Sequence, residues 1–463
     1  MQQESFDLTV IGGGPGGYTA AIRASQLGLK TALVEMDRPG GVCLNWGCIP
    51  SKAILHCAEI METVQSADRY GIRCQGVSLD YGKVIQYSRQ VADRLAKGVE
   101  FLLKKNRVAI FAGHGTLLAP GEVLVEGAEK SKISSPKIIL ASGSRERLLP
   151  GLDIDGRTVL TSREALAREE LPRSVLIIGG GAIGVEFAYA FKSFGVDTTV
   201  VEMMDRLLPE MDEELGRELE RVFKKKKIRI LTSTRCKTHR RGDGAVTVAV
   251  EGQKGDESEL SAEIVLVAVG RAPLTEGLGL ENLRIQTDRG FIRVDERYQT
   301  TCPGIYAVGD VTGPPLLAHR AAAEGIAAVE MMSGKDRKKI TRADVPACVY
   351  CQPEVASIGM TENQAKEAGL TVKVGKFHFR AAGKAVATDH IDGWVKVVSA
   401  ADGRIVGAQM IGKGVTELVA EAGLARDLGI TVGRLAGTLH AHPTLSEAIM
   451  EASLNVMGEG INS

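Results

Sequence analysis

The sequence predicts an α/β protein in which one strand–turn–helix–strand unit occurs twice, followed by an α+β segment at the C-terminal end. Two observations support this prediction. Each unit has a short apolar strand, a glycine-rich turn, an apolar helix and a second strand that ends on a glutamate. The last part of the chain instead alternates apolar and polar residues around an Asp-Gly turn, which is typical of an antiparallel hairpin.

The first unit begins with an apolar strand over residues 8–11, which leads into a glycine-rich turn. Gly12, Gly14 and Gly17 occupy the three positions of a GxGxxG pattern. The first permits a tight turn, the second lets a pyrophosphate approach the backbone, and the third lets the helix pack closely on the strand. The second strand ends at Glu35, which can accept hydrogen bonds from a ribose. This arrangement predicts a Rossmann-like dinucleotide-binding unit.

The second unit repeats the pattern after a strand over residues 174–178. Gly179, Gly181 and Gly184 fill the glycine positions, and Glu202 ends the next strand with the same spacing as in the first unit. Two complete units predict two bound dinucleotides and electron transfer between them. The alternative is a duplicated fold with one inactive site.

Each unit also has a later apolar strand that ends beside small residues. Residues 137–141 lead into Ser142, and residues 264–268 lead towards Gly270. Because ligands of parallel sheets bind at the carboxyl ends of the strands, we expect Ser142 and Gly270 to lie near the two nucleotides.

A pair of cysteines, Cys43 and Cys48, follows the first unit closely. A disulfide across so short a loop contributes only about 2 kcal/mol to stability, so the pair is a weak structural crosslink and a plausible redox switch. The Cα atoms must approach within about 7 Å, which an ideal helix does not allow at this spacing. We therefore expect a distorted helix here.

A histidine near the C-terminal end supplies a base for this thiol chemistry. His442 precedes Pro443, and Glu447 is expected one turn inside the following helix, with Ser446 as its cap. A histidine oriented by a carboxylate is the usual way to form a thiolate at neutral pH. His440 is interpreted as a structural residue.

Composition limits the other functional classes. The 57 basic and 57 acidic residues cancel, so no net charge favours nucleic acid or an anionic membrane. No apolar run is long enough to span a bilayer. The first strand starts too early for a preceding signal peptide, and we expect a cytoplasmic protein.

The remaining cysteines do not resemble a secreted disulfide framework or a metal site. The isolated ones are interpreted as incidental thiols: Cys57, Cys74, Cys236 and Cys302. Cys348 and Cys351 have CxxC spacing but lie in an apolar, strand-like segment with no second ligand pair. No metal is therefore expected.

The domain organisation follows from the order of these elements, with the second nucleotide unit inserted into the first. We expect a first nucleotide-binding part over residues 1–147, the second unit over 148–274, a return to the first domain over 275–339, and a C-terminal domain over 340–463.

Taken together, these motifs resemble the flavoprotein disulfide reductases over nearly the whole chain. The matching segments are the two glycine turns, GGVCLNWGCIPSK at residues 40–52, VAVGRAP, GIYAVGD and HAHPTLSEA. The resemblance implies FAD in the first unit, NAD in the second, and a C-terminal dimerisation domain. It also implies a homodimer in which the histidine works in the partner's site.

The resemblance further implies a role for each matching residue. Cys43 is then the thiol that attacks the substrate, Cys48 the thiol beside the flavin, His442 the acid–base, and Glu447 the holder of its ring. The implied flavin contacts come from Lys52 paired with Glu186, from Asp310 on the ribitol chain, and from the helix that begins at Ala318.

Within the family, GCIPSK is most similar to the dihydrolipoamide dehydrogenases. Glu202 followed by apolar Met203 favours NAD over NADP, because the carboxylate repels a 2′-phosphate. The chain departs from the family pattern at Ser142, where Thr is common, at residues 322–323, where acidic residues are usual, and at residues 351–352, where Thr-His is common.

The expected reaction oxidises dihydrolipoamide through the Cys43–Cys48 disulfide and FAD, and reduces NAD. The expected partner is the lipoyl domain of an acyltransferase in a 2-oxo-acid dehydrogenase complex, or of a glycine-cleavage carrier protein, which places the protein in cell redox homeostasis. One alternative is a reductase of another disulfide or a quinone. Another is a non-catalytic FAD/NAD redox sensor or complex scaffold.

Overall fold

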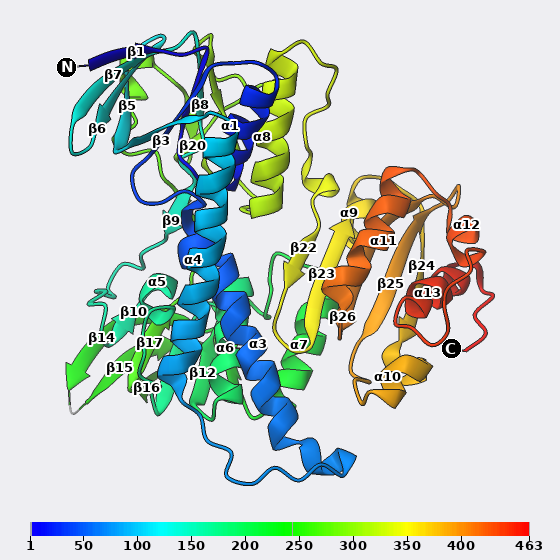
Figure 1. The fold of residues 1–463 in the computed structure, drawn as a ribbon. Coiled ribbons are helices and arrows are strands. Elements are labelled where there is room, and N and C mark those ends of the chain that lie inside the picture. The colour runs from blue at the N-terminus through cyan, green and yellow to red at the C-terminus, as the bar shows by residue number, and fades with distance from the viewer. Residues whose placement is uncertain (1, 243, 463) are drawn as a thin grey trace. The chain divides into compact units, whose positions relative to one another are not determined.

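The structure is a computed structural model that describes residues 2–242 and 244–462, and Figure 1 shows its ribbon. The chain divides into two compact units. The first contains residues 1–53, 82–147 and 271–342, and the second contains residues 54–81, 148–270 and 343–463. The chain thus leaves the first unit three times, after residues 53, 147 and 342, and returns to it twice.

The central sheet of the first unit is parallel, with the order β21-β8-β2-β3-β4. Leu8 pairs with both Thr31 and Lys137, which places β2 in the middle. Strand β21 follows the whole second nucleotide-binding unit in the sequence, yet it joins the sheet of the first nucleotide-binding unit. The second nucleotide-binding unit is therefore inserted into the first. The strands are β2 (Leu8–Ile11), β3 (Thr31–Glu35), β4 (Ala109–Ala112), β8 (Lys137–Leu140) and β21 (Ile305–Ala307).

Helices α1 (Pro15–Gln26) and α8 (Ala318–Met332) pack side by side in this unit (Figure 1). Glycine allows the close approach, because a Cβ at Gly325 would lie 2.3 Å from the Gly16 oxygen. The start of α8 is thereby held next to the first glycine turn.

The rest of the first unit surrounds this sheet. A second sheet has the order β1-β7-β6-β5, and two short ribbons pair β9 with β18 and β19 with β20. The bounds are β1 (Gln2–Ser5), β5 (His114–Ala119), β6 (Glu122–Glu126), β7 (Lys130–Ser134), β9 (Ser144–Glu146), β18 (Arg271–Pro273), β19 (Thr287–Asp288), β20 (Phe291–Ile292), α2 (Gly41–Trp46), and the 3₁₀ turns η2 (Glu281–Leu283), η3 (Gly309–Thr312) and η4 (Arg342–Asp344).

Two long helices follow the cysteine segment. They are α3 (Cys48–Gln65) and α4 (Tyr81–Lys105), with a 3₁₀ turn η1 (Ala67–Tyr70) between them. The 3₁₀ turn ends at Gly71, whose φ of 79° lies in the left-handed region that favours glycine.

The second unit contains the other parallel sheet, with the order β10-β17-β11-β12-β13. An antiparallel sheet, β14-β15-β16, lies between β13 and β17 in sequence. The bounds are β10 (Val159–Leu160), β11 (Ser174–Ile178), β12 (Asp197–Val201), β13 (Arg229–Leu231), β14 (Arg235–Gly242), β15 (Ala245–Glu251), β16 (Glu257–Ala262), β17 (Ile264–Val267), α5 (Ser162–Ala165), α6 (Ala182–Ser193) and α7 (Glu213–Lys225).

The C-terminal part of the second unit is an antiparallel sheet with the order β22-β23-β26-β25-β24, and α11 lies against it in Figure 1. The hairpin predicted around Asp402-Gly403 is confirmed, since Trp394 pairs with Ile411. The bounds are β22 (Ala347–Val349), β23 (Glu354–Gly359), β24 (Val372–His378), β25 (Trp394–Ala400), β26 (Ile405–Gly412), η5 (Phe379–Ala381), α9 (Glu362–Glu367), α10 (Gly383–Ala387), α11 (Val415–Asp427), α12 (Val432–Ala436) and α13 (Glu447–Met457). The predicted fold class is confirmed.

Candidate active site

The first glycine turn forms a cradle between β2 and α1. Gly12 has a φ of 103°, and a Cβ there would lie 2.3 Å from the Ala141 oxygen. A Cβ at Gly17 would lie 1.8 Å from the Gly12 oxygen, so only glycine lets the helix sit this close to the strand. Gly14 is the N-cap of α1 and supplies no side chain. Such a backbone surface at a helix N-terminus fits a pyrophosphate.

Glu35 is held at the end of β3 by backbone amides. Its Oε2 accepts a hydrogen bond from the Gly13 N–H at 2.5 Å, and its Oε1 accepts one from the Asp37 N–H at 2.8 Å. Burial raises the pKa of the Glu35 carboxyl above its ordinary value despite these amides. The acid is therefore fixed beside the glycine turn, where a ribose hydroxyl would reach it.

The cysteine pair lies where the helix is broken, as the spacing required. Cys43 is in α2 and Cys48 is the first residue of α3, and Gly47 between them has a non-helical φ of −151°. A Cβ at Gly47 would lie 3.1 Å from the Val42 oxygen and 3.6 Å from the Cys43 Cα. Both cysteines are free thiols in this structure, and the disulfide between them remains a prediction.

The two thiols are not equivalent. A hydrogen bond to Cys48 and, after it, burial raise the pKa of the Cys43 thiol well above its ordinary value. Cys48 stands at the N-terminal end of α3, where the helix dipole favours negative charge. When the pair is reduced, negative charge is therefore favoured on Cys48.

Lys52 and Asp310 are brought into electrostatic range of this pair. The Lys52 ammonium acts to lower the pKa of Cys43, and the Asp310 carboxylate acts to raise it. Asp310 lies in η3, and its Oδ2 accepts a hydrogen bond from the Ser144 hydroxyl at 2.6 Å. The structure thus gathers a thiol pair, a cation and an acid around the first glycine turn.

Ser142 and Ala318 were also predicted to contact the flavin. The Ser142 hydroxyl donates to the Leu274 carbonyl at 2.7 Å, so its side chain ties two segments of the first unit together. Ala318 is the first residue of α8, and the N-cap Leu317 provides no side-chain acceptor for the first turn. The positive end of this helix is therefore open to an anionic ligand group.

The second glycine turn has nearly the same geometry. Gly179 has a φ of 113°, and a Cβ at Gly184 would lie 1.9 Å from the Gly179 oxygen. Glu202 accepts hydrogen bonds from the Gly180 N–H at 2.6 Å and from the Met204 N–H at 2.7 Å. These contacts repeat those of Glu35, so the second turn also fits a dinucleotide.

The other residues predicted to bind the second nucleotide lie in different structural environments. Gly181 is the N-cap of α6, and Gly270 has a φ of 99° at the end of the segment after β17. Glu186 is buried in α6, and its Oε1 accepts a hydrogen bond from the Tyr350 N–H at 3.0 Å. Lys52 belongs to the first unit and Glu186 to the second, and their pairing remains a prediction.

His442 and Glu447 are in contact in the second unit. His442 Nδ1 lies 2.9 Å from Glu447 Oε1, while the Thr444 N–H donates to Glu447 Oε2 at 2.8 Å. Burial acts to raise the pKa of Glu447, but these two partners outweigh it and hold the pKa below its ordinary value. The His442 side chain is 76% exposed, which leaves Nε2 accessible for proton transfer.

Two details of this segment differ from the sequence expectation. Glu447 is the first residue of α13 rather than one turn inside it, because Ser446 is the N-cap. Ser446 makes no capping hydrogen bond, since its hydroxyl contacts that of Thr444 at 2.9 Å. The first-turn position brings the Glu447 carboxylate back towards the loop that carries His442.

Sequence reasoning missed several polar contacts that shape the site. His440, interpreted as structural, contacts Glu421 through Nε2 at 2.8 Å and is almost fully buried. Ser144 and Arg271 form hydrogen bonds across the β9–β18 ribbon at 2.7 Å. The second serine in the Ser-Gly-Ser run of residues 142–144 could have indicated Ser144 as a site residue. No local sequence pattern links Ser144 to Arg271.

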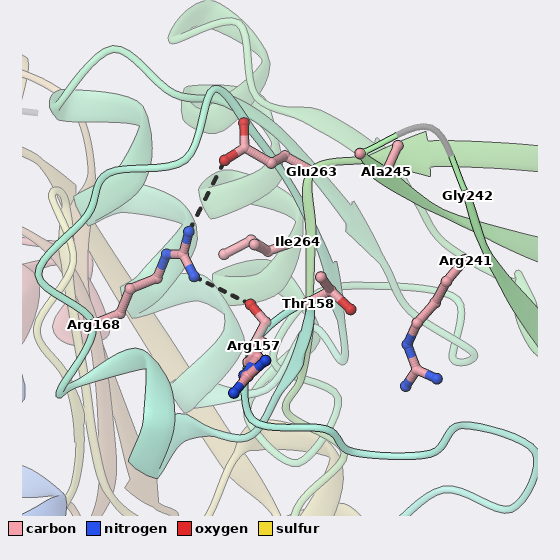
Figure 2. Close-up of a pocket in the computed structure, with 9 residues that line it drawn as sticks. Arg157, Thr158, Arg168, Arg241, Gly242, Ala245, Glu263 and Ile264 are labelled. Carbon is pink, nitrogen blue, oxygen red and sulfur yellow. Dashed lines mark hydrogen bonds and ion pairs between the residues drawn. The ribbon is translucent and has the colours of Figure 1, made fainter.

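A separate, open pocket lies in the second unit (Figure 2). Arg168 donates to the Arg157 carbonyl at 3.1 Å and lies 4.0 Å from a Glu263 oxygen, and Arg241 pairs with Asp155 at 3.1 Å. Two of its arginines therefore already have partners. The predicted site residues are not among those described as lining it.

Residues 2–242 and 244–462 contain neither a candidate metal site nor a candidate membrane-spanning helix. No group of three or more His, Cys, Asp or Glu side chains in these ranges is arranged to hold a metal ion. Within the same described part of the chain, no helix is both long and apolar enough to cross a lipid bilayer.

Comparison with known families gives two adjoining matches. Residues 6–325 match the pyridine nucleotide-disulphide oxidoreductase family, and residues 345–453 match the dimerisation domain of the same family.

Full-length relatives and solved structures agree with these matches. The chain is 46% identical to dihydrolipoyl dehydrogenase from Bacillus subtilis, with 99% of each chain covered, and 43% identical to the enzyme of that name from Chlorobaculum tepidum, with 98% of this chain and 97% of that protein covered. The structure of LpdA from Mycobacterium tuberculosis matches with a TM-score of 0.90 and 28% identity, covering 98% of this chain and 99% of that one. The HOCl-induced flavoprotein disulfide reductase RclA from Escherichia coli matches with a TM-score of 0.86 and 26% identity, covering 96% and 99%.

Proposed function

This chain belongs to the pyridine nucleotide-disulphide oxidoreductase family, and we propose that it is a dihydrolipoyl dehydrogenase that uses FAD and NAD. The observation that carries the proposal is the thiol pair beside the first glycine turn. Cys43 lies in α2, and Cys48 stands at the N-terminus of α3 in the same compact unit as that turn. That arrangement suits a dithiol that accepts electrons on one side and releases them on the other.

The proposed exchange transfers two electrons from substrate to protein. A substrate thiolate attacks Cys43 in the Cys43–Cys48 disulfide and forms a mixed disulfide, with Cys48 leaving as a thiolate. The second substrate thiol, once deprotonated, attacks the substrate sulfur of the mixed disulfide. The bond from that sulfur to Cys43 breaks, Cys43 leaves as a thiolate, and the substrate becomes the cyclic disulfide of lipoamide. The substrate loses two electrons and two protons: the cysteine pair gains the electrons, and the protons go to His442 and to Cys43.

His442 is the proposed proton acceptor for these substrate thiols. Its Nδ1 faces the Glu447 carboxylate at 2.9 Å, which fixes the ring and stabilises it when it is positively charged. The exposed Nε2 is then directed away from Glu447, towards an incoming thiol. In the proposed dimer, that thiol is bound in the partner subunit's site.

FAD, when bound, carries the electron pair from the dithiol to NAD. The residues proposed to hold it are Gly12, Gly14, Gly17, Glu35, Lys52, Ser142, Asp310 and Ala318. The residues proposed to hold NAD are Gly179, Gly181, Gly184, Glu186, Glu202 and Gly270. The glycine cradles and the amide-bound acids at both turns support this assignment.

The matched dimerisation domain supports a homodimer, and a hybrid dimer tests where His442 acts. We expect His442→Gln to reduce turnover by a factor on the order of 100 to 10,000 while FAD stays bound. Random reassociation of inactive Cys43→Ser and His442→Gln chains makes half of the dimers hybrids, each with one intact site. About a quarter of wild-type activity is therefore expected to return. Background activity in mixtures with proven hybrids would mean that His442 serves its own chain's site or is not the base.

The lipoyl domain of an acyltransferase or a glycine-cleavage carrier protein is the proposed donor of the dihydrolipoamide group. We also propose a cytoplasmic location, in keeping with a chain of this length whose cysteines do not form a secreted disulfide framework.

One comparison of substrates tests the function directly. Dihydrolipoamide with NAD should give turnover far above that of oxidised glutathione with NADPH. Turnover only with another disulfide or with a quinone would assign the chain to a different reductase of the family. Absence of turnover with every dithiol, in protein that binds FAD and NAD, would indicate a redox sensor or scaffold.

A further inference from the structure

We propose that Arg271 is a positioning residue for the flavin-binding acid Asp310, and that it acts through the hydroxyl of Ser144. This inference rests on the proposed function, since it takes FAD as the ligand of the first unit. It concerns a residue that the sequence analysis did not single out.

Arg271 is committed to the ribbon that pairs β9 with β18. Its Nε donates to Ser144 Oγ at 2.7 Å, and one Nη donates to the Ser144 carbonyl at 2.6 Å. The other Nη lies 3.3 Å from Glu146 Oε1. The Arg271 side chain is 14% exposed, so these bonds are sheltered from competing water.

The direction of these bonds fixes the serine proton. A guanidinium has only donors, so Ser144 Oγ must accept from Arg271, and its single proton is available for one bond. That proton points to Asp310 Oδ2 at 2.6 Å. Asp310 therefore has one oxygen engaged within the protein, and its carboxylate plane is set so that Oδ1 is the oxygen left to accept from a ribityl hydroxyl.

The backbone of Asp310 is held by different residues. The Gly309 N–H donates to the buried Glu324 carboxylate at 2.8 Å, and Glu324 pairs with Arg320 at 2.8 Å. Arg320 also donates to the Thr312 hydroxyl at 3.0 Å. The η3 turn is thus anchored to α8 independently of Arg271, so loss of Arg271 should release the carboxylate of Asp310 without unfolding its turn.

Arg271 is also the residue at which the chain returns to the first unit. The chain leaves the first unit after Arg147 and returns to it at Arg271, so both connections to the inserted residues 148–270 run through the β9–β18 ribbon. Strand β9 is labelled in Figure 1. The orientation of the flavin-binding acid is therefore tied to the pairing of the two strands that join the nucleotide units.

The test measures the binding of FAD to the apo-protein, with the quenching of flavin fluorescence as the signal. Arg271→Met should weaken FAD binding by a factor on the order of 10 to 100, as expected when a charged hydrogen-bond donor is lost. An FAD analogue with a hydroxyl-free chain in place of ribityl should bind wild type and variant equally. Arg145→Met is the matched control, because Arg145 lies on β9 of the same ribbon and pairs with exposed Glu276 instead.

A mutant cycle shows whether Arg271 acts through Ser144. Ser144→Ala should weaken FAD binding by itself, and adding Arg271→Met to it should cause less than a threefold further loss. Independent, multiplying losses would overturn the proposal, as would unchanged FAD binding in Arg271→Met. If Arg271→Met does not fold, Ser144→Ala with the two ligands decides alone, since equal losses for FAD and the analogue would contradict a ribityl-directed role. Failure of the wild-type protein to bind FAD would instead refute the proposed function.

Discussion

The two glycine turns have almost the same internal geometry but different surroundings. In both, the last glycine packs against the oxygen of the first, and the glutamate is held by two backbone amides. In the first turn, a Cβ at Gly14 would lie 4.0 Å from the Cα of Gly41, which is a van der Waals contact. In the second turn, a Cβ at the equivalent Gly181 would have no contacting atom of the described residues within 4 Å.

The first turn is also enclosed by later parts of the chain. A Cβ at Gly41 would lie 2.6 Å from the Gly14 Cα, and one at Gly16 would lie 3.2 Å from the Ala321 oxygen of α8. Beside the second turn, Met203 and Met204 are 57% and 47% exposed. The same motif can therefore serve a cofactor that stays bound, where other segments close over it, and a substrate nucleotide that exchanges, where its edge is open.

The largest expected effect comes from the last glycine of each turn. Gly17→Ala would place a Cβ 1.8 Å from a backbone oxygen, and Gly184→Ala would place one at 1.9 Å. The local clash is equal, so the consequence should depend on the ligand of each turn. We expect Gly17→Ala to be purified without flavin, and Gly184→Ala to retain FAD while kcat/KM for NAD falls by at least about 100-fold.

Flavin absorbance per chain and NAD titrations distinguish the two variants. Thermal unfolding of both proteins serves as the control for general damage. Loss of flavin from Gly184→Ala as well as from Gly17→Ala would show that the two turns do not serve separate ligands.

The second prediction concerns the thiols, which occur beside the first turn only. Cys48 is favoured as the thiolate, so the two-electron-reduced protein with bound FAD should show a long-wavelength thiolate–flavin absorption band. Cys48→Ser should abolish this band, and Cys43→Ser should show it without reductant because its Cys48 thiolate is unpaired. Both variants should lose dihydrolipoamide turnover by at least about 1,000-fold. Absence of the band in Cys43→Ser at every pH would reverse the assignment of the two sulfurs.

The contrast between the turns also shows what the sequence could predict. The strands, the glycine positions and both glutamates follow from spacing, because positive φ at Gly12 and Gly179 and close packing at Gly17 and Gly184 leave no other residue type. The break between Cys43 and Cys48 followed from the geometry that a disulfide requires.

The surroundings of the turns were not predictable in the same way. The hydrogen bond of Arg271 to Ser144 joins residues 127 positions apart, and the approach of α8 to Gly16 is set by the packing of α8 against α1. The position of Glu447 at the start of α13 depends on Ser446 being the N-cap residue, although the Ser446 hydroxyl contacts Thr444 and makes no capping hydrogen bond. Such contacts depend on tertiary structure that a local pattern does not encode.

The third prediction sharpens the functional difference between the two glutamates. Glu202 should repel the 2′-phosphate of NADP, so wild type should prefer NAD by at least about 2–3 kcal/mol in kcat/KM. Glu202→Gln removes the charge and should reduce this preference. Glu35→Gln, the same change at the first turn, should leave it unaltered in protein that still holds FAD. Equal catalytic efficiency of wild type with both nucleotides would contradict the assignment of Glu202.

The smallest expected effect concerns the clamp that closes α8 onto α1 in the first unit. Glu330 on α8 is 2% exposed and pairs with Arg23 on α1 and, at 2.5 Å, with Arg337. Hydrogen bonds from these two arginines lower the pKa of Glu330 from 4.5 to about 2. A carboxyl whose pKa is depressed by folding stabilises the protein above its unfolded pKa, and that stabilisation is lost as the pH falls through the folded value.

Glu330→Gln should therefore lower stability by about 1 kcal/mol at pH 7, and the difference from wild type should shrink between about pH 4.5 and pH 2. Thermal unfolding against pH measures it. Glu220→Gln is the control, because Glu220 pairs with exposed Lys224 one turn away on α7 of the second unit. A constant difference across this pH range would mean that the charge of Glu330 does not hold α1 and α8 together.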